Sequence, residues 1–229
     1  MIRAAVLGLG WWGRTLVRGA AASGRIEVVA GATGRRALAE EFAAEQGFRL
    51  HDSYEAVLAD PQVEAVILAT PHLDHERQVI AAARAGRHVF CEKPFTLSKD
   101  SAERAVAAAR EAGVALGLGH NRRFHPNLIE MRRRVRDGGM GTLLHGEGTM
   151  TGPNGLFLKP GHWRTDPEQT PAGGMAGLGI HMIDGLIDLM GEIEAVAAQS
   201  IHRAAIAGTE DTTSVLLRFR SGATGYVSC

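Results

Sequence analysis

The chain has 229 residues, enough for one large domain or two modest ones, and its 45% of hydrophobic residues can build a substantial core. Basic and acidic residues both number 25, so no net charge attracts nucleic acid or an anionic membrane, and neither is expected as a partner. Two cysteines, Cys91 and Cys229, are too few for a disulfide framework, and neither a leader nor an apolar run of 18 residues is present, so we expect a soluble, cytoplasmic protein.

The first half of the chain alternates short apolar runs with alanine-rich amphipathic stretches. The pattern predicts strands at 3–9, 26–32, 63–70, 88–92 and 115–120, and helices to about 23 and at 35–46, 53–59, 73–85 and 98–112. Strands that are apolar along most of their length and separated by helices indicate a parallel sheet covered on both faces. We therefore expect residues 1–121 to form a doubly wound nucleotide-binding domain of the Rossmann type.

The second half, residues 122–229, has a different pattern. It predicts a basic helix near 126–137, a strand at 142–151, a Gly/Pro-rich loop at 152–174, a helix at 175–190, and strands near 193–203, 211–220 and 223–229. These elements indicate an α+β domain on a mostly antiparallel sheet. The last strand ends with the chain, so we expect the sheet to be left with an open edge there. The fold class is therefore α/β with an incomplete second domain.

The stretch "GLGWWG" places Gly8, Gly10 and Gly13 in G-x-G-x-x-G spacing, directly after the first strand and at the start of the first helix. Gly8 permits the tight turn, Gly10 lets a pyrophosphate approach the backbone, and Gly13 allows close helix–strand packing. The helix start adds unpaired N–H groups that attract an anion. The alternative is a merely flexible glycine turn. The context favours a dinucleotide cradle, with Trp11 and Trp12 as further cofactor-binding candidates.

The choice of cofactor depends on the end of the second strand, where an acidic residue would accept the adenosine ribose hydroxyls. The sequence there is "GATGRR", with Thr33 at the acidic position, followed by Arg35 and Arg36. The two arginines can bind a 2′-phosphate through charge-assisted hydrogen bonds, which favours NADP over NAD. The alternatives are a solvated helix start at the arginines and NAD as the cofactor.

The stretch "FCEKPF" places Glu92 and Lys93 at the end of an apolar strand, at the edge of a parallel sheet that faces the ligand crevice. Pro94 disfavours helical geometry at Lys93 and keeps it extended. A lysine beside an apolar wall can exchange a proton with a substrate hydroxyl, with Glu92 as counter-charge. A surface Glu–Lys pair explains the same residues, and the spacing alone leaves both interpretations open.

Five stretches in order carry a resemblance to a known family. They are "GLGWWG" at 8–13, "ILATPHLDH" at 67–75, "GRHVFCEKPFTLS" at 86–98, "GHNRRFHP" at 119–126 and "GGMAGLGIHMID" at 173–184. Together they resemble the Gfo/Idh/MocA oxidoreductase family. The resemblance implies an N-terminal Rossmann domain that binds NAD(P). It also implies a second α/β domain whose open sheet commonly forms the interface of a homo-oligomer, a dimer or a tetramer.

The resemblance also implies roles for individual residues. Lys93 matches the catalytic lysine and His181 the histidine on the first helix of the second domain, while Glu92 falls close to the nicotinamide. The remaining matches are the cofactor loop Thr70, Pro71 and His75, the interdomain segment Asn121, Arg122 and Arg123, and the substrate-loop residues Trp163 and Arg164. Asn121 is counted with the cofactor site and Arg122 and Arg123 with the substrate site.

The chain departs from the family pattern at Gly177, where many members have an aspartate four residues before the histidine, on the same helix face. That carboxylate would orient His181 or bind a substrate hydroxyl, so another group substitutes for it or the polyol chemistry is altered. Asp184 either orients His181 or makes a structural hydrogen bond. The chain is also shorter than is usual for the family, so it is truncated or another subunit covers the open edge.

Other features predict no further site. His72 and His75 are three residues apart, but no third ligand completes a metal site, so no metal is expected. The basic run at 131–137 fits a solvated helix face, and Cys91 a small core residue.

The sequence therefore predicts an NADP-dependent oxidoreductase that transfers hydride between the nicotinamide and a carbinol carbon of a sugar, polyol or cyclic diol. The alternatives are a cofactor-binding sensor or scaffold without efficient catalysis, and cleavage or epimerisation with tightly held NAD.

Overall fold

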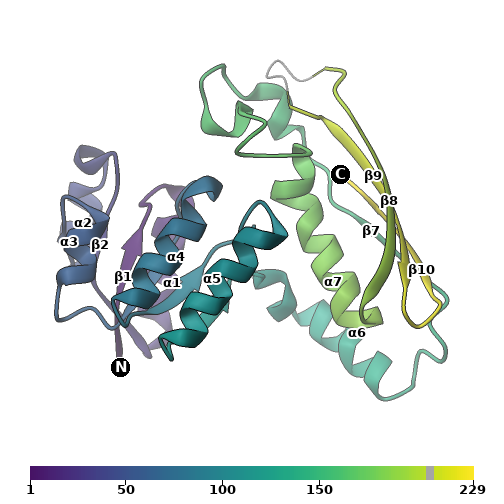
Figure 1. Ribbon diagram of the computed structural model, residues 1–229, viewed down its shortest axis with the longest axis horizontal. Helices are drawn as coiled ribbons and strands as arrows, with labels where there is room; N and C mark the ends of the chain where they lie inside the picture. Colours follow the sequence, from purple (N-terminus) through teal and green to yellow (C-terminus); the bar gives the residue numbers. More distant parts are fainter. Residues whose placement is uncertain (205–208) are drawn as a thin grey trace. The chain divides into compact units, whose positions relative to one another are not determined.

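The computed structural model describes residues 1–204 and 209–229, which divide into two compact units, Met1–Gly119 and His120–Cys229 (Figure 1). Among these residues, no helix combines the length and the apolar character needed to cross a membrane. The described residues form two sheets, of six and of four strands.

The first unit is built on a six-stranded sheet in which every neighbouring pair is parallel. Its order is β3-β2-β1-β4-β5-β6, with β1 at Ile2–Leu7, β2 at Ile26–Ala32, β3 at Arg49–Leu50, β4 at Ala65–Leu68, β5 at His88–Cys91 and β6 at Leu116–Leu118. The expected doubly wound sheet is thus confirmed. The strand order reverses between β1 and β4, which is where such sheets open a ligand crevice beyond their carboxyl ends.

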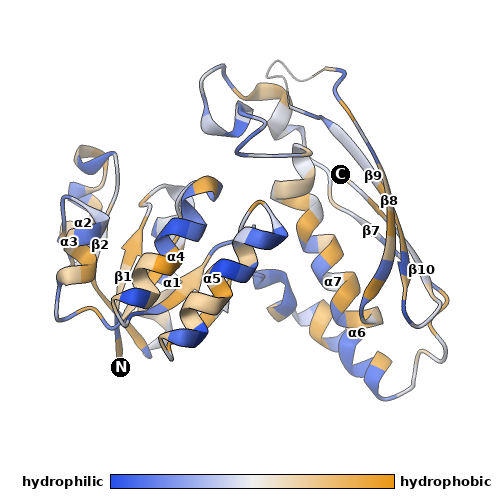
Figure 2. Ribbon diagram, in the orientation of Figure 1, coloured by the Kyte–Doolittle hydropathy of each residue, from blue (hydrophilic) through white to orange (hydrophobic). Residues whose placement is uncertain are grey.

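Helices cover both faces of this sheet because successive strand residues point to opposite sides. The helices α1 (Trp11–Ser23) and α2 (Glu40–Gln46) pack on one face, where Val6 belongs to a core with Val17 and Phe42. The helices α3 (Tyr54–Ala59), α4 (His75–Arg84) and α5 (Lys99–Glu111) pack on the other, where Leu7 is buried. Figure 2 shows β1 as a hydrophobic strand.

Two details of the first unit differ from the sequence prediction. The two-residue strand β3 was not predicted, because "RL" is too short to show an alternating pattern. The helix expected at 35–46 is divided into a 3₁₀ turn at Arg36–Leu38 and α2, with Ala39 ending the first and preceding the second.

The second unit consists of a four-stranded sheet with helices α6 (Pro126–Arg136) and α7 (Ile180–Met190). Its order is β7-β10-β9-β8, with β7 at His145–Thr149, β8 at Ile193–Ile201, β9 at Thr212–Phe219 and β10 at Thr224–Ser228. The pairs β8–β9 and β9–β10 are antiparallel and β7–β10 is parallel, so the expected mostly antiparallel sheet is confirmed.

The prediction that the last strand leaves an open edge was wrong. β10 lies inside the sheet, because β9 pairs with one side of its backbone and β7 with the other. Its Val227 is fully buried. The edge strands of the described sheet are β7 and β8.

The helix α7 covers one face of this sheet. Val215, Leu217 and Phe219, which alternate along β9, form a core with Leu186 of α7. Figure 2 shows α7 as hydrophobic over much of its length. A π-helical turn at Met175–Gly179 leads into α7 and holds Gly177. Such turns are frequent at functional sites.

Candidate active site

The candidate residues of the first unit follow the carboxyl ends of its strands. Gly8 follows β1, Thr33 follows β2, Thr70 follows β4, and Lys93 follows β5. Because parallel strands end at one edge of the sheet, the fold gathers these separate sequence motifs there.

The glycine motif has the geometry of a cradle for a dinucleotide phosphate. Gly8 has a φ of +86°, and a Cβ there would collide with the Ala69 carbonyl, while a Cβ on Gly13 would collide with the Gly8 carbonyl. A Cβ on Gly10 would meet nothing within 4 Å. The helix α1 begins without a side-chain cap or an acidic residue in its first turn. Its free N–H groups and the open space at Gly10 therefore fit a pyrophosphate.

A hollow of about 390 Å³ adjoins this cradle. It is lined by Leu9, Gly10, Trp11, Arg14, Arg18, Thr33, Arg35 and Leu38. Four of the predicted cofactor residues, Gly10, Trp11, Thr33 and Arg35, are thus brought together. Trp12 is not part of the lining, and its ring lies 5.4 Å from that of Trp11.

Arg36 does not line the hollow although it follows Arg35 directly. Its guanidinium lies 2.7 Å from the Asp52 carboxylate and 3.4 Å from that of Glu40, and it also donates to the Leu50 carbonyl. The structure thus shows Arg36 in ion pairs that hold the segment after β2 to the segment after β3.

Arg14 and Arg18 line the hollow but were not among the predicted site residues. The sequence does contain a signal for them. Gly10, Arg14 and Arg18 are spaced four residues apart, which places them on one face of a helix that starts at the phosphate cradle.

His75 joins the loop after β4 to the segment that carries Lys93. Its ring is fully buried, with Nδ1 2.8 Å from the Pro94 carbonyl and Nε2 3.1 Å from the Thr70 carbonyl. A carbonyl oxygen can only accept, so a ring nitrogen that carries hydrogen donates to the carbonyl beside it, and the tautomer decides which of the two carbonyls receives the bond. The Thr70 hydroxyl donates to the Gln78 side chain at 2.6 Å. In residues 1–204 and 209–229, no group of three potential ligands is placed to hold a metal.

Glu92 and Lys93 differ in their surroundings. The Glu92 carboxylate is buried and accepts a hydrogen bond from the Lys93 backbone N–H at 3.2 Å, whereas the Lys93 side chain is half-buried. A Cβ on Gly119, just after β6, would lie 2.7 Å from a Glu92 carboxylate oxygen. The Glu92 carboxylate therefore occupies the space that a side chain at position 119 would need. The Lys93–Pro94 peptide bond is cis.

Cys91 precedes this pair and is fully buried among the core residues, as predicted. Burial raises the pKa of the Cys91 thiol, and the nearby Glu92 carboxylate raises it further. A thiol in this state is a poor nucleophile.

In the second unit, His181 lies on α7 and is 7% exposed. The ring of His120 meets it edge-on, with the two centroids 6.3 Å apart, and His120 Nδ1 lies 3.7 Å from the Asp184 carboxylate. His120 was not predicted as a site residue, although it stands in the "GHNRRFHP" stretch immediately before Asn121.

Arg123 is held by α7. Its guanidinium donates three hydrogen bonds of 2.8 to 3.0 Å to the Asp184 carboxylate and one of 3.3 Å to Asp188. The Asp188 carboxylate also forms an ion pair with Arg132 at 2.8 Å. The hydrogen bonds to Asp184 raise the pKa of Arg123. These contacts give Asp184 a structural role, as a link between α7 and the short turn that holds Arg123.

The other predicted residues of this unit lie in two separate turns. Asn121 and Arg122 are exposed in a 3₁₀ turn at Asn121–Phe124. Trp163 and Arg164 begin the 3₁₀ turn Trp163–Thr165, where the Arg164 guanidinium lies over the Trp163 ring at 4.2 Å from its centroid.

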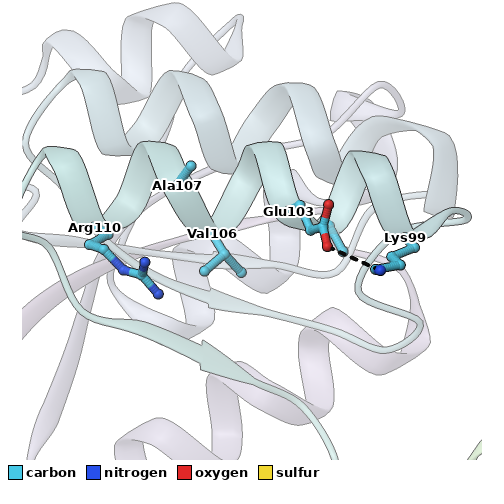
Figure 3. Close-up of a pocket in the computed structure, with 6 residues that line it drawn as sticks. Lys99, Glu103, Val106, Ala107 and Arg110 are labelled. Carbon is cyan, nitrogen blue, oxygen red and sulfur yellow. Dashed lines mark ion pairs between the residues drawn. The ribbon is translucent and has the colours of Figure 1, made fainter.

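A second hollow, of about 340 Å³, runs along the outer side of α5 (Figure 3). It is lined by Lys99, Ala102, Glu103, Val106, Ala107 and Arg110, and Lys99 pairs with Glu103 at 3.5 Å. None of the residues proposed for cofactor or substrate lines it.

The sequence matches two adjoining family domains. Residues 2–120 match the oxidoreductase family with an NAD-binding Rossmann fold, Gfo/Idh/MocA, and residues 128–229 match the Gfo/Idh/MocA C-terminal domain. The chain is 33% identical to 1,5-anhydro-D-fructose reductase of Ensifer adhaerens over 74% of its own length and 51% of that protein. It is 32% identical to trans-1,2-dihydrobenzene-1,2-diol dehydrogenase of Mus musculus, over 94% of this chain and 63% of that protein.

A solved structure agrees with these matches. The WlbA dehydrogenase from Bordetella pertussis, in complex with NADH and UDP-GlcNAcA, is 30% identical and gives a TM-score of 0.91 over 99% of this chain and 66% of that one. The chain thus spans between about half and two thirds of the length of these relatives. Since the two domain matches cover nearly all of its residues, the chain belongs to the Gfo/Idh/MocA family of oxidoreductases.

Proposed function

We propose that this protein is an NADP-dependent oxidoreductase that transfers hydride between the nicotinamide and a carbinol or carbonyl carbon of a sugar, polyol or cyclic diol. The observation that carries the proposal is the phosphate cradle at Gly8–Gly13 on the same sheet edge as Lys93. The names of the relatives, a sugar reductase and a diol dehydrogenase, support the substrate class.

The preference for NADP rests on the hollow beside the cradle. Thr33 stands where a carboxylate would bind the ribose of NAD, Arg35 lines the same hollow, and none of the eight lining residues is acidic. NAD is the alternative, since the WlbA dehydrogenase was solved with NADH.

The proposal gives a role to each catalytic candidate. Lys93 exchanges a proton with the substrate oxygen, and the buried Glu92 carboxylate provides a fixed negative charge next to it along the chain. His181 is the second catalytic candidate and would bind and polarise a substrate oxygen. His75 lies between the Pro94 and Thr70 carbonyls and so holds the segment just after Lys93 against the loop after β4. When bound, the nicotinamide would supply or accept the hydride.

Replacing Lys93 with methionine tests the central assignment. Loss of the proton carrier should lower kcat by about 10²- to 10⁴-fold, because general acid–base groups contribute on that scale. NADPH binding, measured by fluorescence titration, should weaken far less. Turnover equal to that of the unchanged protein would refute the assignment of Lys93.

A cofactor-binding sensor or scaffold is the second candidate, and Gly177 is the observation that favours it, since this position lacks the carboxylate that many relatives carry. Mixing the protein with NADPH and a panel of sugar and diol carbonyls separates the two functions. A reductase consumes the absorbance of NADPH, whereas a sensor binds the cofactor without oxidising it. Cleavage or epimerisation with held NAD would convert the substrate without a net change in absorbance.

We also propose that the protein forms a homo-oligomer, a dimer or a tetramer, through the sheet of its second unit. Leu216 of β9 is 60% exposed on the face opposite α7, next to Tyr226 of β10, its cross-strand partner. We place the interface on this face because it presents a large exposed apolar side chain on a side of the sheet that α7 does not cover. A cytoplasmic location is part of the same proposal, because soluble NADP is turned over inside cells.

A further inference from the structure

Three guanidinium groups line the hollow beside the phosphate cradle, and only that of Arg35 was foreseen from the segment after β2. The other two, Arg14 and Arg18, come from consecutive turns of α1. We propose that Arg14 and Arg18 form, with Arg35, a three-arginine site for the 2′-phosphate of the cofactor, so that the first helix shares in selecting NADP. The inference rests on the proposed function and adds two specificity residues to it.

The first argument is the lack of counter-charge. In residues 1–204 and 209–229, none of the three guanidinium groups is ion-paired with a carboxylate, whereas Arg36 nearby is paired twice. Arg14 and Arg18 each lie with Cζ 5.1 Å from the centroid of the Phe42 ring, so they cannot be farther apart than twice that distance. This upper limit is comparable with the Debye length of about 8–10 Å at 0.1–0.15 M salt, so the repulsion between the two charges is only partly screened. A bound dianion relieves the repulsion.

The second argument is that the two arginines are held in place before any ligand binds. The Arg14 guanidinium donates to the Leu9 carbonyl at 3.3 Å and to the Leu38 carbonyl, which fixes its plane between the cradle and the segment after β2. Arg18 lies over the ring of Phe42, which is 3% exposed and therefore rigid. Groups that are already ordered lose little entropy on binding and form stronger, more selective contacts.

The third argument is chemical. A phosphate monoester carries up to two charges and several acceptor oxygens, which match a set of guanidinium donors. A ribose 2′-hydroxyl that donates a hydrogen bond needs an acceptor, and the Thr33 hydroxyl is the one acceptor among the lining side chains. Thr33, which lines the hollow, stands at the position where this family of folds places the adenosine ribose.

The test is calorimetric titration of the whole chain with NADPH and NADH, and with 2′,5′-ADP and 5′-AMP to isolate the adenosine end. Arg18→Met should raise the Kd for NADPH and for 2′,5′-ADP about 10-fold or more, since a charge-assisted hydrogen bond is lost. The Kd for NADH and for 5′-AMP should change less than about 3-fold, which also shows that the variant is folded.

Two further variants sharpen the result. Arg25→Met removes an equal charge just after α1 at the opposite, amino-terminal edge of the sheet, and it should leave all four Kd values unchanged. Arg14→Lys keeps the charge but loses the planar guanidinium that donates to the Leu9 and Leu38 carbonyls. NADPH binding should therefore weaken while NADH binding is kept.

Two outcomes overturn the inference in different ways. If the unchanged protein prefers NADPH and Arg18→Met keeps that preference, the proposed three-arginine site is wrong and the proposed cofactor stands. If the unchanged protein prefers NADH, the choice of NADP fails and the arginine site with it. Loss of NADPH preference in Arg36→Met but not in Arg18→Met also overturns it.

Discussion

At the scale of single residues, the buried Glu92 carboxylate restricts which side chain can stand at position 119. The carboxylate is 5% exposed, next to the lysine proposed for proton transfer, and fills the space beside Gly119. A glycine that ends a strand would ordinarily be interpreted as part of a turn. Here its lack of a side chain keeps a buried acid in place.

Replacing Gly119 with alanine should therefore damage the site. The new methyl group would lie 2.7 Å from the Glu92 carboxylate, too close for a normal contact, so the acid must move. We expect a loss of about 1–3 kcal/mol in the free energy of unfolding, which is typical of overpacking, together with a lower kcat. Urea denaturation and steady-state kinetics measure the two effects.

Gly117→Ala is the matched control, two residues earlier in β6. A Cβ there would lie 3.6 Å from the Phe90 ring, an ordinary contact, so neither stability nor kcat should fall by as much. Equal effects at both positions would show that the strand, and not the position of Glu92, is sensitive.

At the scale of elements, Asp60 links β3, the loop after it and the end of α3. It is buried and accepts hydrogen bonds from the Gln62 backbone N–H at 2.9 Å and from Arg49 at 2.8 Å, and it lies 2.9 Å from His51. The Gln62 N–H, with help from His51 and Arg49, holds the pKa of Asp60 below its usual value. β3 has only two residues, so these contacts supply much of what attaches it.

The lowered pKa of Asp60 predicts a dependence of stability on pH. The ionised carboxylate stabilises the fold above its unfolded pKa of about 4, and this contribution is lost as the pH falls through the lower folded value. Asp60→Asn should cost about 1–3 kcal/mol at pH 7, and the difference from the unchanged protein should shrink as the pH falls below about 4. Chemical denaturation at pH 7, 5 and 3 measures it; a constant difference would contradict the prediction.

The sequence predicted elements best where an apolar pattern continues over several residues. The strands β1, β2, β4, β5 and β6 and the helices between them follow from that pattern, whereas β3 is fixed by pairing with Ala30 and Gly31 of β2, which no local signal reveals. The position of β10 between β7 and β9 is likewise a property of long-range pairing, and the end of the chain had suggested an edge instead.

The candidate site shows the same limit. Gly8, Thr33 and Lys93 stand in contiguous motifs whose chemistry can be inferred from their neighbours. The different positions of Arg35 and Arg36, and the approach of His120 to Asp184 across 64 positions of the chain, depend on tertiary packing. Sequence spacing from Gly10 places Arg14 and Arg18 on one helix face, but their approach to Thr33 and Arg35 depends on packing.

At the scale of the whole molecule, the proposed oligomer predicts a specific sensitivity. Leu216→Lys places a charge in the middle of the open face of the sheet, and burying an unpaired charge in an interface is strongly unfavourable. We expect light scattering to show a shift toward the monomer, with the Kd for NADPH unchanged.

Val196→Lys is the control for this experiment. Val196 of β8 is 61% exposed, almost the same as Leu216, but it pairs with Leu217 and so belongs to the opposite face of the sheet. The mass in solution should not change in this variant. A shift in both variants would indicate a general loss of stability, and no shift in Leu216→Lys would remove the proposed interface.

The inner position of β10 also has a consequence for the order in which the protein folds. His145 of β7 and Thr224 of β10 lie side by side but are 79 positions apart. On the ribosome, the first unit is synthesised in full before any of the second, and its sheet can form while the rest is still being made. β7 is synthesised well before β10, so its backbone stays unpaired until β10 has been made. An unpaired strand can pair with other nascent chains, and we therefore expect a chaperone to act before β10 docks.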